Sequence, residues 1–241
     1  MKVGHRLAMH LHVDLFRLRN RTPMVSFTFD DLPKSAVTMG AELLEGHGAR
    51  GTFYVSGGLV GLETTDWAAG DAEDLLSLHR RGHEIGCHTF SHLRACDLDE
   101  AAMTKEIARN RDYFHALDPS MRIDSFAYPF GYGSLARKYQ LKNEFQTSRS
   151  IVPGVNAGSV DLQFLRAMPL IDREMDRDGI DCAFDEAQTN NGWLIFYGHD
   201  VIDRPSPYGC TPGLLEHALE TARERNVPAL TVAEAMRCAR A

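Results

Sequence analysis

Short runs of strand-forming residues alternate along this chain with longer stretches of helical composition. Strands are predicted at residues 24–29, 51–55 and 84–87, and helical patterns follow them, for example at 71–81. Strict alternation of this kind predicts a parallel sheet covered by helices, either open or closed into a barrel. The run at 193–197 (WLIFY) is almost entirely apolar, which is typical of a strand buried on both faces.

The same pattern continues through the rest of the chain. Further strands are predicted at 123–128, 147–152, 164–170 and 229–230. Further helices are predicted at 35–45, from Asp97 or Asp99 to about Leu117, and at 135–141, 179–189, 212–225 and 232–240.

Length and composition favour a single domain. The chain has 241 residues, 44% hydrophobic and 24% charged, and no repeat, low-complexity tract or linker divides it. We therefore expect one domain over residues 1–241, in which residues 1–22 form an N-terminal arm. Three histidines, His5, His10 and His12, are expected on an exposed amphipathic face of that arm.

Charge and cysteine content argue against several classes of protein. A net charge of −7 lacks the basic footprint of a nucleic-acid-binding protein. No run approaches the ~18 consecutive apolar residues of a membrane span, and the first residues lack the apolar core of a signal peptide. The five cysteines form an odd set without a C-x-x-C pair, which is typical of reduced thiols. We therefore expect no nucleic-acid partner, no membrane span and a cytoplasmic location.

Polar residues lie at the ends of predicted strands, where parallel α/β folds carry their functional groups. Asp30 and Asp31 come directly after the strand at 24–29. Two adjacent carboxylates repel each other, so the pair is costly unless a cation or a proton separates their roles. For this pair alone, a solvated turn before Pro33 is the alternative.

Two histidines follow the strand at 84–87. His88 and His92 are four residues apart, so both rings can lie on one face of a helical turn and reach one metal ion. An isolated pair of this kind is equally typical of a protein surface. Two imidazoles and a carboxylate from another strand end form a three-ligand set that suits Zn²⁺ and leaves a position open for water. The combination favours a metal site.

Two further segments place aromatic residues beside strand ends. Residues 125–131 (SFAYPFG) favour a stacking wall and a close backbone approach at Gly131, although a turn with core aromatics is the alternative for Tyr128. Residues 193–200 end in His199-Asp200, and a lone histidine at a strand end is more often structural than catalytic. Composition suggests stacking on sugar rings by Tyr128, Phe130, Tyr132 and Tyr197.

Four ordered motifs carry a family resemblance. They are TFDD at 28–31, HTFSH at 88–92, FAYPFG at 126–131 and YGH at 197–199, supported by GTFYVSG at 51–57 and GHEIGCH at 82–88. In this order they resemble the motifs of the polysaccharide deacetylase family (NodB-homology, carbohydrate esterase). The resemblance implies an α/β fold, a deformed, incomplete (β/α) TIM-like barrel, and metal-dependent removal of an acetyl group from a sugar.

The resemblance also implies a role for each motif residue. Asp30 would be the catalytic base and His199 the general acid, while the backbone N–H of Phe130 would stabilise the oxyanion. The metal ligands would be Asp31, His88 and His92. The chemistry is consistent: a metal activates a bound water and polarises the amide carbonyl, Asp30 accepts the proton of the water, and His199 protonates the leaving amine.

The chain departs from the common family pattern at several positions. Leu32 stands where the family usually has glycine, and Ala127 and Phe130 stand where the third motif usually has arginine and tyrosine. Tyr197 replaces a leucine that would line the pocket for the acetyl methyl group. These changes leave the implied metal ligands intact.

The fourth motif is the weakest. It usually ends in Asp-Trp, whereas residues 169–173 (PLIDR) offer only Asp172. Asp172 is therefore the candidate partner that orients His199, and a solvated surface aspartate is the alternative.

The expected activity is hydrolysis of an N- or O-acetylated carbohydrate by attack of a metal-bound water, with an oligosaccharide or glycan precursor as substrate. One divalent ion per chain is expected, Zn²⁺ first, with Co²⁺, Ni²⁺ or Mn²⁺ also compatible with the ligand set. The alternatives are a metal-independent hydrolase of small cyclic amides on the same fold and a non-catalytic sugar-binding module. The sequence does not predict an oligomeric state.

Overall fold

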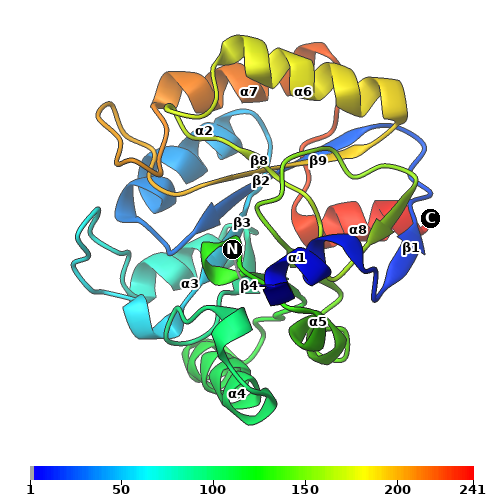
Figure 1. Ribbon diagram of the computed structural model, residues 1–241. Helices are drawn as coiled ribbons and strands as arrows, with labels where there is room; N and C mark the ends of the chain where they lie inside the picture. Colours follow the sequence, from blue (N-terminus) through cyan, green and yellow to red (C-terminus); the bar gives the residue numbers. More distant parts are fainter. Residues whose placement is uncertain (1–2) are drawn as a thin grey trace.

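Seven strands of the computed structural model form one curled parallel sheet with helices packed around it (Figure 1). The structure describes residues 3–241. The order across the sheet is β6-β5-β4-β3-β2-β9-β8, and every neighbouring pair is parallel. The strands are β2 (Met24–Asp30), β3 (Thr52–Val55), β4 (Glu84–Cys87), β5 (Ser125–Ala127), β6 (Thr147–Arg149), β8 (Met168–Pro169) and β9 (Trp193–Gly198). The predicted incomplete α/β barrel is confirmed.

Apolar residues on both faces fix the centre of the sheet. Every residue of β2 and of β9 is buried, which confirms the interpretation of the apolar run at 193–197. The rings of Phe27 and Phe196 stack at 5.6 Å, and those of Phe29 and Phe53 at 5.2 Å. The rings pack the centre of the sheet against its covering helices.

Eight α-helices lie among the described residues, and several begin at predicted caps. Asp71 caps α3, and Asp99, rather than Asp97, caps α4. The helix predicted at 35–45 begins as the π-helix η1 (Ala36–Gly40), where Gly40 approaches Val201 closely. In Figure 1, α6 and α7 run side by side. The helices are α1 (Val3–His10), α2 (Ala41–Gly46), α3 (Ala72–Arg80), α4 (Glu100–Leu117), α5 (Leu135–Leu141), α6 (Arg177–Asn190), α7 (Pro212–Glu224) and α8 (Val232–Arg240).

The segment between β6 and β9 is less regular than predicted. Only Met168–Pro169 of the strand expected at 164–170 forms a ladder, while Leu165 makes an isolated bridge to Arg149 of β6. The segment therefore contacts β6 first and β9 next, which are near opposite edges of the sheet. The strand expected at 229–230 is likewise a single bridge from Ala229 to Val25.

Residues 3–17 form an integral part of the fold. Helix α1 packs on α5, and β1 (Leu15–Arg17) pairs antiparallel with β7 (Ser159–Asp161). His5 is 7% exposed and accepts a hydrogen bond from the N–H of Gly133 (3.3 Å). The predicted exposure of His5 is therefore wrong, because its ring fills a place between α1 and the loop before α5.

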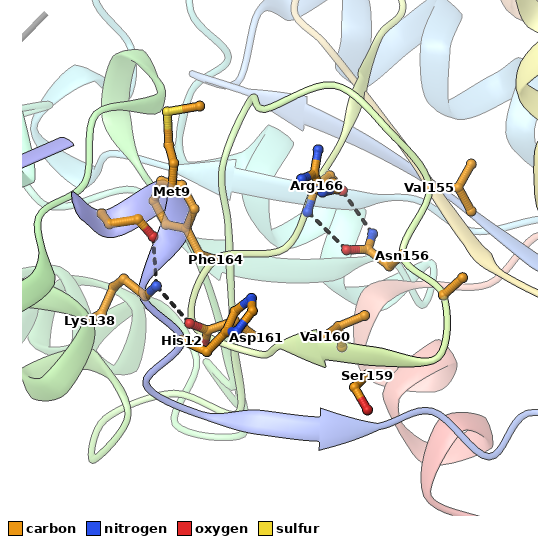
Figure 2. Close-up of a pocket in the computed structure, with 12 residues that line it drawn as sticks. Met9, His12, Lys138, Val155, Asn156, Ser159, Val160, Asp161, Phe164 and Arg166 are labelled. Atoms are coloured by element: carbon orange, nitrogen blue, oxygen red, sulfur yellow. Dashed lines mark hydrogen bonds and ion pairs between the residues drawn. The ribbon is translucent and has the colours of Figure 1, made fainter. Parts of the chain in front are cut away.

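A buried lysine anchors this region. Lys138 donates to the carbonyls of Ala8 (2.7 Å) and Leu11 (2.6 Å) and forms an ion pair with Asp161 (2.6 Å) beside a polar pocket of about 190 Å³ (Figure 2). Such partners are what a buried ammonium group requires. Among residues 3–241, no helix has the length and apolarity of a membrane span.

Candidate metal and catalytic site

Polar side chains from three strand ends meet in one cavity of about 700 Å³. Asp30 is the last residue of β2 and Asp31 follows it, while His88 and His92 follow β4 and His199 follows β9. All five side chains line the cavity. Parallel strands end at the same edge of a sheet, so residues far apart in the sequence converge there, as the motif spacing predicted.

Asp31, His88 and His92 form a compact group of possible metal ligands. Oδ1 of Asp31 lies 3.8 Å from Nε2 of His88 and 3.3 Å from Nε2 of His92. One ligand atom from each residue lies within 4.8 Å of the others. The carbonyl of Ala127 accepts a hydrogen bond from Nδ1 of His88 (2.8 Å), which turns the Nε2 lone pair toward Asp31.

The chemistry of this group fits a divalent cation. Oδ1 of Asp31 is buried and has no hydrogen-bond partner among the described residues, and a cation would satisfy this oxygen. Burial, followed by the charge of Asp30, raises the pKa of Asp31 to about 8. Burial lowers the pKa of His88 to about 3 and that of His92 to about 4, so both imidazoles are neutral near pH 7 and can act as ligands.

Asp30 is paired with a buried arginine that the sequence analysis missed. Nη2 of Arg149 lies 2.5 and 2.6 Å from the two carboxylate oxygens, and both side chains are almost fully buried. Burial alone would raise the pKa of Asp30, but the charge of Arg149 holds it below its usual value. Asp30 is therefore ionised near pH 7, and its proton affinity is set chiefly by Arg149.

The strand layout explains where this arginine comes from. Arg149 ends β6, directly opposite Ala127 of β5, and the curl of the sheet aims it at β2. The rings of Tyr54 and Tyr197 lie 5.1 and 5.4 Å from its guanidinium carbon. The signal in the sequence was the position of Arg149 inside the strand predicted at 147–152. A buried arginine needs a counter-charge, so its place in a strand indicated an acidic partner.

His199 is held by a backbone carbonyl. Its Nδ1 lies 3.2 Å from the carbonyl oxygen of Tyr208, and its Nε2 lies 4.0 Å from Oδ2 of Asp31. The ring of Trp67 packs against it at 5.2 Å between centroids. Donation from Nδ1 to the carbonyl leaves Nε2 facing the cavity, and burial lowers the pKa of the imidazole.

Phe130 forms part of the cavity wall with strained backbone. It lies in η4 (Pro129–Gly131) with φ 58°, and its ring lies 4.5 Å from that of His92. The guanidinium carbon of Arg94 lies 4.9 Å from the centroid of the Phe130 ring. Two backbone hydrogen bonds close this turn, from the N–H of Gly131 to the carbonyl of Tyr128 and from the N–H of Tyr132 to the carbonyl of Pro129. The N–H of Phe130 is not a donor in either of them.

Comparison with known proteins agrees with these motifs. Residues 17–146, more than half of the chain, match the family model for polysaccharide deacetylase. The chain belongs to the polysaccharide deacetylase family.

It is similar to a probable peptidoglycan-N-acetylglucosamine deacetylase of Arthroderma benhamiae, with 24% identity over 216 residues that cover 88% of this chain and 44% of the relative. It is also similar to a chitin deacetylase of Pestalotiopsis sp, with 32% identity over 88 residues that cover 35% of this chain and 26% of the relative. The chain thus spans less than half the length of these curated relatives.

Solved structures share the polysaccharide deacetylase fold. The chitin deacetylase of Colletotrichum lindemuthianum superposes with a TM-score of 0.65 at 17% identity, covering 90% of this chain and 89% of that one. A peptidoglycan deacetylase from Bacillus subtilis gives a TM-score of 0.60 at 17% identity, covering 90% and 92%. At this level of identity the likeness is one of fold.

Two residues predicted for this polysaccharide deacetylase site lie elsewhere. Tyr128 is 1% exposed, and its hydroxyl donates to the carbonyl of Gln163 (3.0 Å), so the prediction that it stacks on a sugar is wrong. Asp172 accepts hydrogen bonds from Thr211 (2.9 Å from the N–H) at the start of α7. The prediction that Asp172 orients His199 is wrong, because the carbonyl of Tyr208 occupies that position.

The remaining predicted residues line the cavity, and one departure from the polysaccharide deacetylase pattern is explained. Tyr132 and Tyr197 line the cavity, and their stacking on a sugar stays a prediction. Leu32 has φ 53°, a left-handed conformation that glycine adopts more easily, which accounts for the glycine usual at this place. Left-handed non-glycine residues recur in the loops around the cavity, namely at Asp31, Leu32, Thr89, His92 and Phe130.

Proposed function

We propose that this protein is a metal-dependent hydrolase that removes acetyl groups from an acetylated carbohydrate. The observation that carries the proposal is the juxtaposition of two carboxylates in different states within one cavity. Asp31 faces two neutral imidazoles with an unpartnered oxygen, whereas Asp30 is ionised and paired with Arg149. Separate environments for two adjacent carboxylates support separate roles for them.

Each residue has a role that its contacts support. Asp31, His88 and His92 would hold the cation, which when bound polarises the substrate carbonyl and lowers the pKa of water. Asp30 accepts a proton in its ionised form, and Arg149 keeps it ionised. His199 presents Nε2 to the cavity without a proton, because its Nδ1–H donates to the carbonyl of Tyr208. Nε2 would take up the proton that Asp30 accepts from the water and deliver it to the leaving group. The N–H of Phe130 donates to the developing oxyanion.

The cavity and the relatives support a sugar as the substrate. A volume of about 700 Å³ suits a small ligand, and aromatic rings of Trp67, Phe130, Tyr132 and Tyr208 line it. The similar proteins are named for chitin and peptidoglycan, which both carry N-acetylated glucosamine. We therefore propose N-acetylated oligosaccharides as the first substrates to test, with O-acetylated sugars as the comparison.

Acetate release tests the proposal. Chelated protein and the same sample after Zn²⁺ is restored are compared on acetylated chitin and peptidoglycan fragments and on sugar esters. Release that disappears on chelation and returns with Zn²⁺ supports the proposal. Release that survives chelation favours a metal-independent amide hydrolase, and sugar binding without release favours a binding module.

Zinc binding is expected to depend on pH through Asp31. Because burial raises its pKa to about 8, the metal-free carboxyl is protonated near pH 7 and must lose a proton when the cation binds. The apparent affinity should therefore rise by up to about tenfold per pH unit from pH ~5 and level off above pH ~8. His88 and His92, with pKa values of about 3 and 4, add no dependence in this range. Calorimetry in buffers of different ionisation enthalpy measures the released proton, and binding without proton release contradicts the prediction.

Replacing Tyr197 by leucine is expected to widen the acyl specificity. Tyr197 lines the cavity at the position where the family usually has leucine against the acetyl methyl group. A smaller residue makes room for one more methylene, which is worth about 10–200-fold in specificity. The ratio of kcat/KM for propionylated over acetylated substrate should therefore rise by at least about tenfold. Tyr132→Leu, a change in another lining ring, is the control, and an unchanged ratio in Tyr197→Leu would disprove the assignment.

A further inference from the structure

One buried carboxylate holds the loop that joins the two histidines. Glu106, on α4, is 6% exposed. Its Oε2 accepts hydrogen bonds from the backbone N–H groups of Phe90 (3.0 Å) and Ser91 (2.7 Å), and its Oε1 accepts one from the hydroxyl of Ser91 (3.1 Å). All three donors belong to residues between His88 and His92. Glu106 therefore fixes the backbone between the two imidazoles without lining the cavity itself.

The conformation of this loop makes such support necessary. Thr89 and His92 have φ values of 59° and 52°, which are costly for residues with a Cβ atom. A carboxylate that receives two consecutive N–H groups also satisfies donors that the loop would otherwise bury unpaired. Neutral groups bind the loop carbonyls: the N–H of Gly58 donates to Phe90 and the hydroxyl of Ser56 donates to His88. Arg109 contacts only side chains of the loop, with its guanidinium carbon 4.0 Å from the centroid of the Phe90 ring and Nη1 3.5 Å from the hydroxyl oxygen of Ser91. The carboxylate of Glu106 accepts charge-assisted hydrogen bonds from the backbone N–H groups of the loop, and such bonds are the stronger type.

Helix α4 is a rigid base for this carboxylate. Asp99 caps the helix, and Met103, Ile107 and Phe114 bury one side of it. Asn110, one turn beyond Glu106, binds the N–H of Gly57 and the carbonyl of Val55. The helix is thus attached by polar contacts both to the end of β3 and to the loop after β4.

We propose that Glu106 is a positioning residue of the metal site: by fixing the backbone of Phe90 and Ser91, it aims His88 and His92 at the cation and raises the affinity for the metal. The inference rests on the proposed metal site. It concerns a residue that touches neither metal nor substrate, so its effect must be read in the affinity for zinc rather than in turnover alone.

Zinc affinity and amide exchange test the inference. Metal-free Glu106→Ala and Glu106→Gln are titrated with Zn²⁺ beside the unaltered chain, and hydrogen exchange is followed at Phe90 and Ser91. Loss of an outer partner of a metal ligand typically lowers affinity by about 10–100-fold, and this is the drop expected for Glu106→Ala. Glu106→Gln keeps an acceptor oxygen but loses the charge, so a smaller drop is expected. Exchange at both amides should be faster in both variants.

A second glutamate, partly buried, provides the control. Glu84, at the far end of β4, also accepts three hydrogen bonds, from Thr52, Ser125 and the N–H of Ala233. Glu84→Gln should lower thermal stability while leaving zinc affinity unchanged. Unchanged affinity and exchange in the Glu106 variants, or an equal loss of affinity in Glu84→Gln, would overturn the inference. If Glu106→Ala does not fold, Glu106→Gln decides. Absence of zinc binding by the unaltered chain would overturn the proposed metal site itself, whereas zinc binding that the Glu106 variants retain in full overturns this inference alone.

Discussion

Replacing Asp30 by asparagine is expected to abolish most of the turnover while leaving zinc binding intact. An asparagine side chain cannot accept a proton at neutral pH, and general-base catalysis of this kind typically contributes about 10²–10⁴-fold to the rate. The new side chain keeps the size of the old one and one acceptor for Arg149, so the cavity should hold its shape. Measured as kcat/KM for acetate release, the loss should therefore fall in that range, with the zinc content still about one per chain.

The same change from aspartate to asparagine at the next residue, Asp31, is the matched control. Asp31→Asn removes the anionic ligand, so zinc affinity should fall together with activity, and added Zn²⁺ should restore part of both. The two variants separate a proton-accepting role from a ligand role. Full activity in Asp30→Asn would show that another group accepts the proton, and loss of zinc from that variant would show that both aspartates are ligands.

Replacing Arg149 by methionine is expected to shift the pH profile and to destabilise the fold. Without the guanidinium group, burial is opposed by fewer charges, so the pKa of Asp30 should rise. If Asp30 is the ionised base that we propose, activity should then be lost at a higher pH on the acidic side than in the unaltered chain. Removing one partner of a buried pair typically costs about 3–5 kcal/mol, which denaturant unfolding measures.

A second buried ion pair separates these two effects. Lys138 and Asp161 are as deeply buried as Arg149 and Asp30 but lie beside α1 rather than in the cavity (Figure 2). Lys138→Met should cost similar stability and leave the acidic limb of the pH–rate profile in place. Arg149→Lys retains a positive charge and should shift that limb less than Arg149→Met. An acidic limb that does not move in either Arg149 variant would contradict the assigned role.

Local features of the sequence predicted most of the fold and the grouping of Asp31, His88 and His92. Asp30 ends β2 and Asp31 follows it, while His88 and His92 follow β4 within a few residues, so position along the chain was enough. The predicted parallel sheet then required these ends to meet. The cytoplasmic location inferred from the cysteines stays a prediction.

Local sequence patterns did not predict the contacts between segments that are far apart in the chain. Arg149 is 119 residues from Asp30, and their contact depends on how far the sheet curls, which no local pattern encodes. Asp172 follows the expected chain order, but the turn that ends at α7 uses its carboxylate and brings the carbonyl of Tyr208 to His199 instead. Tyr128 was predicted to stack on a sugar only because it is an aromatic residue near a strand end, and its side chain is buried in the core.

The residues with left-handed backbone conformation around the cavity also limit how the thermal stability of this protein can be raised. Asp31, Leu32, Thr89, His92 and Phe130 each hold a backbone conformation that costs of the order of 1–3 kcal/mol. Selection for thermal stability would favour relieving these conformations, and the same changes would release the loops that carry the candidate metal ligands. Selection for stability and selection for turnover therefore act in opposite directions on the same positions. Stabilising substitutions are better placed on the exposed faces of α6, α7 and α8, away from the cavity.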